Sequence, residues 1–245
     1  MNNIKSISNK DLEIAAKNIE KNVKYDKEGK LIASALKQFP LNNNNAIISM
    51  KICLIDLTHG TNLMKNLGTN GGIVDLSEKI AQVNFDKRVE MGDLTLVNEL
   101  AKWTKEKIGK NLFSFISKYC LYHNYHCYNR DDYVIYDSVL ANNINNYITN
   151  DEYKNLTGRT LYKTSIRRYK DNFKYEEYKR IIDFIIKKNN LTVHMTHRKL
   201  DWFIWDKYRN KKEQNWEQMK IIKKKYNLSM DKLLIISYYR ATIKL

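Results

Sequence analysis

The chain has 245 residues, 43% of them hydrophobic, which is enough for one large domain or two small ones that share a cleft. Its net charge of +16 favours a polyanionic partner such as nucleic acid, although a lysine-rich composition alone gives the same excess. Glycine and proline number only 8 and 1, which argues against a turn-rich sheet protein and favours helices.

The sequence also bears on location. No run of about 18 apolar residues occurs, so we expect no membrane span. The first residues lack the apolar core of a signal peptide. Three cysteines without framework spacing favour a reducing compartment. We therefore expect a monomer in the cytoplasm, associated with the nucleoid if the source is prokaryotic.

The first hundred residues show helical periodicity in several segments. Apolar residues recur at helical spacing over 9–22, 30–39 and 74–84. Residues 46–57 are so apolar that we expect the whole segment to be interior. Asp93 is predicted to be the N-cap of a further helix that ends at 108, before a turn over 108–111.

A lysine and an aspartate then stand in apolar sequence. Lys118 lies in an apolar helical segment, and Asp137 follows the apolar run 133–136 after an interval of 19 positions (137 − 118). Charged groups in such surroundings are costly unless they are paired or used. An apolar setting also favours the neutral amine that a lysine nucleophile needs. Two plainer interpretations stay open: Asp137 is only a helix N-cap, or Lys118 is one more solvated lysine.

The pair resembles the catalytic Lys and Asp of the helix-hairpin-helix DNA glycosylase superfamily, in particular its 8-oxoguanine DNA glycosylase branch. Residues 112–118, LFSFISK, stand where that family has a hairpin of the form L-P-G-V-G-x-K. Residues 134–138, VIYDS, stand where it has V-P-V-D-V, with a matching Lys-to-Asp interval. Ser114 and Ile116 occupy the positions of the hairpin glycines, and a serine there is still able to cap a helix.

The resemblance implies an all-α, two-lobed glycosylase-like fold with a central cleft. Residues 46–150 would form the central lobe with the hairpin and the catalytic pair. Residues 1–45 with 151–245 would form the second lobe of a single domain, 1–245. The implied activity is that of a bifunctional DNA glycosylase and abasic-site lyase in base-excision repair. Lys118 would attack the deoxyribose C1′ of a flipped base in double-stranded DNA, Asp137 would assist it, and no cofactor is required.

Several polar or aromatic residues are predicted to contact DNA or the base pocket. One group follows the apolar segment 46–57, where relatives of this kind insert a polar stretch into DNA, although an ordinary helix end explains it equally well. Others belong to the hairpin segment, to the basic section 154–170, or to the aromatic-rich helix predicted over 197–206. The candidates are His59, Thr61, Asn62, Ser114, Phe115, Ser117, Arg167, Arg168 and Trp202.

Other features leave alternatives open. The spacing C-x2-H-x2-H-C over 120–127 does not match common zinc sites, so we expect no metal. Further helices are predicted over 173–188, 214–226 and 229–243. The alternative function is a non-catalytic basic helical protein that binds nucleic acid. A helical interaction protein, basic only through its composition, is the third interpretation.

Overall fold

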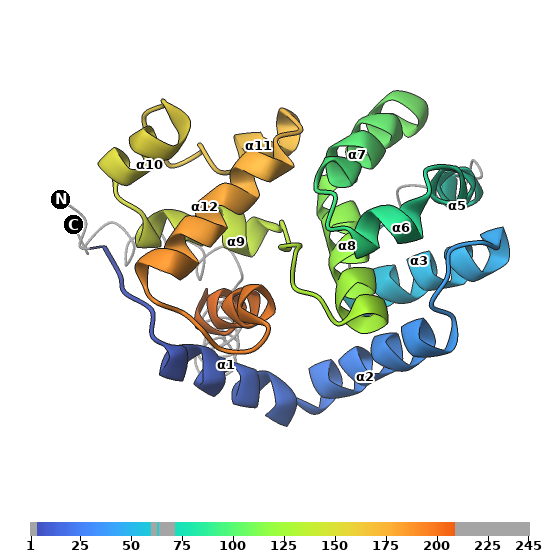
Figure 1. Cartoon of the computed structure of the whole chain (residues 1–245), viewed down its shortest axis with the longest axis horizontal. Helices are drawn as coiled ribbons and strands as arrows, with labels where there is room; N and C mark the ends of the chain where they lie inside the picture. The colour runs from blue at the N-terminus through green and yellow to red at the C-terminus, as the bar shows by residue number, and fades with distance from the viewer. Residues whose placement is uncertain (1–3, 60–62, 64–71, 209–245) are drawn as a thin grey trace, which may run out of the picture.

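A computed structural model describes residues 4–59, 63 and 72–208 (Figure 1). Every regular element within these residues is a helix and none is a strand, which confirms the predicted all-α class for this part of the chain. The elements are α1 (Asn9–Lys21), α2 (Val23–Gln38), α3 (Asn45–His59), α5 (Gly72–Gln82), α6 (Phe85–Glu90), α7 (Thr95–Ile108), α8 (Phe113–Tyr128), α9 (Ser138–Asn143), the 3-10 helix η1 (Ile144–Tyr147), α10 (Asn150–Thr157), α11 (Arg168–Asp171) and α12 (Tyr175–Lys188), followed by a helix over 196–208.

Local sequence sets the ends of several helices. Ser8 is the N-cap of α1 and forms a capping box with Asp11, and Thr149 forms the same motif with Glu152 at α10. Gly109 ends α7 with φ at 74°, in the left-handed region that glycine adopts without strain. Each of these signals lies within four residues of the helix end, so each is readable from the sequence.

The helix α8 lies at the centre of the described fold, in contact with α2, α3, α6 and α7 (Figure 1). All of its residues from 115 to 124 are buried, as expected of a helix that has no solvent-facing side. Aromatic rings fill much of the space around it. Phe113 packs edge-on against Tyr136 and Tyr175, with ring centroids 5.1 and 5.8 Å apart. Lys118 is therefore part of the core helix.

Residues 130–137, called the connector below, join α8 to α9 without regular structure, although 133–136 are buried. Buried backbone groups need hydrogen-bond partners, and here side chains supply them. The Tyr175 hydroxyl accepts from Val134 N at 2.8 Å and donates to Val134 O at 2.6 Å. The Tyr178 hydroxyl donates to Ile135 O at 2.9 Å. Two tyrosines of α12 therefore fix the path of the connector.

Segments near the two ends of the described chain lie side by side, with α1 against the helix 196–208 (Figure 1). Asn18 Nδ2 donates to Asp206 Oδ2 at 2.9 Å, and Lys199 Nζ pairs with Glu13 Oε1 at 2.7 Å. The helix α2 instead packs on α3 and α8. The division into a 46–150 lobe and a second lobe stays a prediction.

The expectation that residues 46–57 are entirely interior is wrong. Ile48, Ile52 and Ile55 of α3 are buried, but Leu57 is 80% exposed. A helix turns by about 100° per residue, so a long apolar run directs some of its side chains outward whatever its composition.

Other boundaries also differ from the prediction. The helix α2 begins at Val23 rather than near 30. Leu94, not Asp93, is the N-cap residue of α7. Asp93 still stabilises this turn, because its Oδ1 accepts from Thr95 N at 3.0 Å. No helix within the described ranges is long and apolar enough to span a membrane. The helices predicted over 214–226 and 229–243 lie outside the described residues.

Candidate active site

The helices α7 and α8 contact each other and form a helical hairpin whose turn covers 109–112. Side chains hold this turn: Thr104 Oγ1 accepts from Leu112 N at 3.2 Å, and Asn111 Oδ1 accepts from Phe113 N at 3.1 Å. Ser114 and Ile116, expected at hairpin-glycine positions, lie inside α8 instead. Only Gly109 needs a positive φ in this turn, so the hairpin forms without further glycines.

Lys118 lies in the second turn of α8 with 6% of its surface exposed. Its Nζ donates to Ser114 Oγ, one turn earlier, at 3.1 Å. Ser117 is fully buried, and its hydroxyl donates to Ser114 O at 3.0 Å. Phe115 is also buried and packs against Tyr119 with ring centroids 5.8 Å apart. Ser117 and Phe115 therefore offer no surface to DNA in this conformation, whereas Ser114 contacts the amine directly.

Asp137 ends the connector and is the N-cap of α9. Its Oδ1 accepts from Val139 N and Leu140 N, both at 2.8 Å. The predicted N-cap is thus confirmed, and it orients the carboxylate. An N-cap role leaves a second oxygen for other partners, so capping and chemistry are compatible here.

One hydrogen bond explains why the interval between the lysine and the aspartate matters. Tyr136 N donates to Ser117 Oγ at 3.0 Å, across the same separation of 19 residues. Lys118 and Asp137 are the next residue along each of these two segments. The bond between α8 and the connector therefore brings the predicted pair into one region.

A second carboxylate, Asp201, marks the same region. Burial and the negative charge of Asp137 raise its pKa, and the positive charges of Arg198 and Lys118 lower it. Burial outweighs the rest, so the pKa of Asp201 is about 6, above the usual value for an aspartate. Both members of the predicted pair are thus close enough to act on Asp201.

Arg198 connects Asp201 to α8. Its Nη1 lies 3.0 Å from Asp201 Oδ2, and its Nη2 donates to the Tyr122 hydroxyl at 2.7 Å. The guanidinium also lies over the rings of Tyr122 and Trp202, at 4.9 and 5.1 Å from their centroids. Tyr122 stands one turn after Lys118 on α8. The predicted Trp202 is therefore part of this cluster.

Arg198, Asp201 and Tyr122 are absent from the sequence-based candidates. A signal for two of them exists, because an Arg-x-x-Asp pair in an apolar, aromatic helix places opposite charges on one face. No local pattern in the sequence indicates that this pair lies near α8. Arg198 bonds to Tyr122 of that helix across 76 residues.

The basic section adjoins both the hairpin and the connector. Asn111 Nδ2 donates to Lys170 O at 3.0 Å, and the Tyr136 hydroxyl donates to Arg167 O at 2.9 Å. Arg167 and Arg168 are exposed, with Arg167 also bonded to Asn142. These contacts place the predicted arginines at the surface beside the residue that precedes Asp137.

The remaining predictions have different outcomes. Thr61, Asn62 and the side chain of His59 lie outside the described residues, so their roles stay predictions. Cys120 and His123 are buried in the core, and burial lowers the pKa of His123 to about 3. Within the described ranges no three His, Cys, Asp or Glu side chains are grouped as a metal site.

Comparison with known proteins gives one family match. Residues 11–132 match the model of an uncharacterised family described as an N-terminal domain. The match covers α8 with Lys118 and stops within the connector, before Asp137. No curated protein and no solved structure matches the chain significantly.

Proposed function

We propose that the protein is a DNA glycosylase with abasic-site lyase activity, which excises a damaged or modified base from double-stranded DNA. One observation carries the proposal: Lys118, Asp137 and the Arg198–Asp201 pair meet beside a helical hairpin. A nearly buried lysine whose charge acts on a buried carboxylate together with a second acid and a guanidinium is an arrangement that tunes proton transfer. The resemblance to helix-hairpin-helix glycosylases supplies the reaction class.

The reaction begins with extrusion of the target nucleotide from the duplex, which costs a few kcal/mol of stacking and pairing. The neutral Lys118 amine attacks C1′, the glycosidic bond breaks, and the base leaves with the bonding electrons and takes up a proton. The resulting adduct opens to a Schiff base. Loss of a C2′ proton and of the 3′ phosphate then cleaves the strand by β-elimination, and no cofactor enters any step.

The acids have separate tasks in this scheme. Asp137 is oriented by two backbone N–H groups, which suits it to stabilising positive charge that develops on the sugar. Asp201, with its pKa raised by burial to about 6, is the better acceptor for the proton that Lys118 must lose. Arg198 balances the second negative charge.

The exposed basic surface supplies the contact to the DNA backbone. Arg167 and Arg168 lie on a segment bonded to both the hairpin turn and the connector. Duplex phosphates held there would lie near the proposed site rather than at a remote face. Because Lys118 is 6% exposed, we expect the side chains around it to move when a flipped nucleotide enters.

Reduction with borohydride tests the proposal, because it converts a Schiff base into a stable protein–DNA adduct. Wild-type protein is incubated with abasic duplex and with a panel of lesion-bearing duplexes, 8-oxoguanine included. We expect an adduct with abasic DNA and with at least one lesion. Duplex binding without any adduct would instead favour a non-catalytic nucleic-acid-binding protein.

A further inference from the structure

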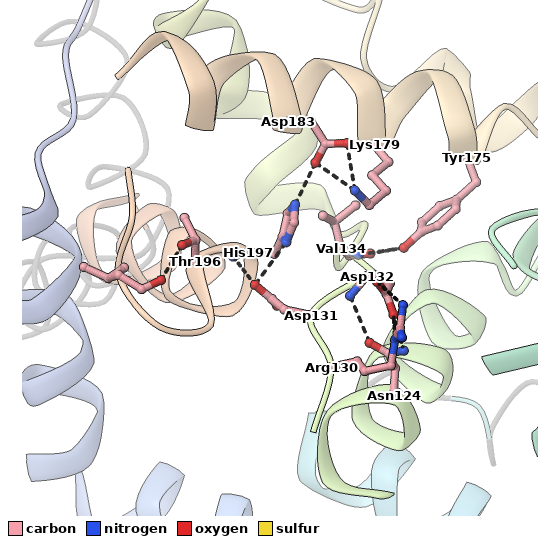
Figure 2. A network of polar contacts seen from close by, with 11 residues as sticks. Asn124, Arg130, Asp131, Asp132, Val134, Tyr175, Lys179, Asp183, Thr196 and His197 are labelled. Atoms are coloured by element: carbon pink, nitrogen blue, oxygen red, sulfur yellow. Dashed lines mark hydrogen bonds and ion pairs between the residues drawn. The ribbon is translucent and has the colours of Figure 1, made fainter. Parts of the chain in front are cut away.

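His197, near the start of the helix 196–208, is held between two carboxylates (Figure 2). Its Nδ1 lies 3.1 Å from Asp131 Oδ2, and its Nε2 lies 2.7 Å from Asp183 Oδ1. Asp131 belongs to the connector and Asp183 to α12. A single imidazole thus joins three segments that are distant in sequence.

Further bonds fix this junction. The oxygen of Asp131 that faces the ring also accepts from His197 N at 2.9 Å, which caps the start of the helix. Lys179 Nζ lies 2.8 and 2.7 Å from the two oxygens of Asp183 (Figure 2). The His197 side chain is 16% exposed, so solvent screens these bonds only weakly.

The charges around the ring decide its protonation. Burial disfavours the protonated ring, but the hydrogen bonds that the ring donates to Asp131 and Asp183 outweigh burial and the opposing charge of Lys179, and they raise the pKa of His197 to about 9. Both ring nitrogens face carboxylate oxygens, and only an imidazolium can donate to both. The ring is therefore a cation at neutral pH.

The junction joins the two segments that carry the acids of the proposed active site. Asp131 precedes Asp137 by six positions (137 − 131) on the connector, and His197 is adjacent to Arg198, the partner of Asp201. The neighbouring connector residue Asp132 is tied to α8, since Asn124 Nδ2 donates to Asp132 Oδ2 at 2.9 Å (Figure 2). Movement of the helix 196–208 relative to the connector is thus opposed at His197.

We propose that protonated His197 is a positioning residue, which holds the connector and the helix 196–208 at the spacing that Asp137 and Asp201 require. Its effect on catalysis rests on the proposed function, whereas its effect on geometry does not. His197 touches no reacting atom in this scheme. It acts through the two segments that it joins.

Nuclear magnetic resonance on the wild-type protein provides the first test. The ring nitrogens of His197 are observed from pH 5 to pH 10. We expect both nitrogens protonated at pH 7 and a titration midpoint near pH 9. A ring that is neutral at pH 7 would overturn the proposal without any variant being made. The rings of His123 and His126 serve as references for neutral imidazole, because burial lowers their pKa values to about 3 and 4.

The second test uses His197→Gln, with His194→Gln as its matched control, because His194 is an exposed histidine three positions earlier. The amide signals of Val139 and Leu140 report the cap formed by Asp137. We expect His197→Gln to shift both signals and to lower the single-turnover rate roughly tenfold, with DNA affinity within about twofold. The control should change neither.

The outcomes separate the two proposals. If wild-type protein forms no adduct but His197 titrates near pH 9 and the variant shifts the two amide signals, the proposed function fails and the positioning role stands. If adducts form but His197→Gln leaves the amides and the rate unchanged, the positioning role fails. Should His197→Gln not fold, Asp183→Asn removes one side of the junction and is read in the same way.

Discussion

Two buried lysines in this protein have opposite surroundings. Lys51 of α3 is fully buried, and its Nζ donates to Leu41 O at 2.9 Å and to Asn42 Oδ1 at 3.3 Å. Lys118 of α8 donates to Ser114 Oγ at 3.1 Å. Its charge, like those of Asp137 and Arg198, acts on the carboxylate of Asp201. The first lysine donates to two neutral acceptors of a loop, and the second donates to a serine and acts on the carboxylate of Asp201.

The comparison shows that burial alone does not make a nucleophile. Burial lowers the pKa of Lys51 to about 8, which is the shift that a reactive lysine needs. Asn42 is in turn bonded to Asp86 and Tyr119, so the whole Lys51 group ties α3, α6 and α8 together. A reactive amine also needs groups that take its proton and stabilise charge on the substrate. Asp86 acts on Lys51 but is bonded to Asn42, whereas Lys118 acts together with Asp137 on Asp201.

The largest expected effect is on covalent trapping. Lys118→Ala should abolish the borohydride adduct, because no other described amine has this set of neighbours, while duplex affinity stays within about threefold. Lys51→Met is the matched control and should form the adduct as wild type does. Equal trapping by Lys118→Ala and wild type would contradict the assignment, and loss of trapping in Lys51→Met alone would reverse it.

Asp137→Asn should reduce the rate of adduct formation by roughly 10²–10⁴-fold, the usual range for a positioned proton-transfer or charge-stabilising group. Asparagine is nearly as good an N-cap as aspartate, so thermal stability should change little. Single-turnover kinetics and a melting curve measure the two effects. A normal rate with lowered stability would reduce Asp137 to its capping role.

Lys51→Met should destabilise the fold by about 2–3 kcal/mol, because Leu41 O and Asn42 Oδ1 lose a donor in the interior. Urea unfolding followed by circular dichroism measures this change. Lys118→Ala, measured in the same way, should change stability less. Equal destabilisation of the two variants would contradict the assignment of Lys51 to a structural role and of Lys118 to catalysis.

The pH dependence should follow Asp201. Burial raises the pKa of Asp201 to about 6 in the folded state, so the folded protein holds this proton more tightly than the unfolded chain does. The resulting contribution to the free energy of unfolding is present at low pH and is lost as pH rises through about 6. The trapping rate should change the opposite way, increasing as Asp201 ionises to accept a proton. Asp201→Asn should remove the limb near pH 6 and slow the reaction about tenfold at pH 7. An unchanged pH profile in this variant would assign that limb to another group.

The last expected effect concerns DNA affinity. Charge reversal of Arg167 and Arg168 should weaken duplex binding roughly tenfold at low salt, equally for all sequences, and should flatten the salt dependence. Fluorescence anisotropy at several salt concentrations measures both. Reversal of Lys10 and Lys17, which are exposed on α1, is the control. Equal losses in both variants would trace binding to net charge rather than to the surface beside the hairpin.

The sequence by itself determined the elements that depend on near neighbours. Helical periodicity, the capping boxes of α1 and α10, the glycine that ends α7 and the N-cap role of Asp137 all depend on residues within one or two turns. The interval of 19 residues between Lys118 and Asp137 was also readable from the sequence. The hydrogen bond between Tyr136 and Ser117 spans the same interval and brings the two segments that carry the pair together.

Only the tertiary structure decided which groups surround each charge. Lys51 and Lys118 both stand in apolar helical sequence, and nothing local distinguishes a lysine that meets Leu41 O from one near Asp201. The same holds for the connector, whose backbone is satisfied by tyrosines of α12 about 40 residues away. Periodicity and capping act over a few residues, whereas the partner of a buried charge comes from whichever helix packs against it.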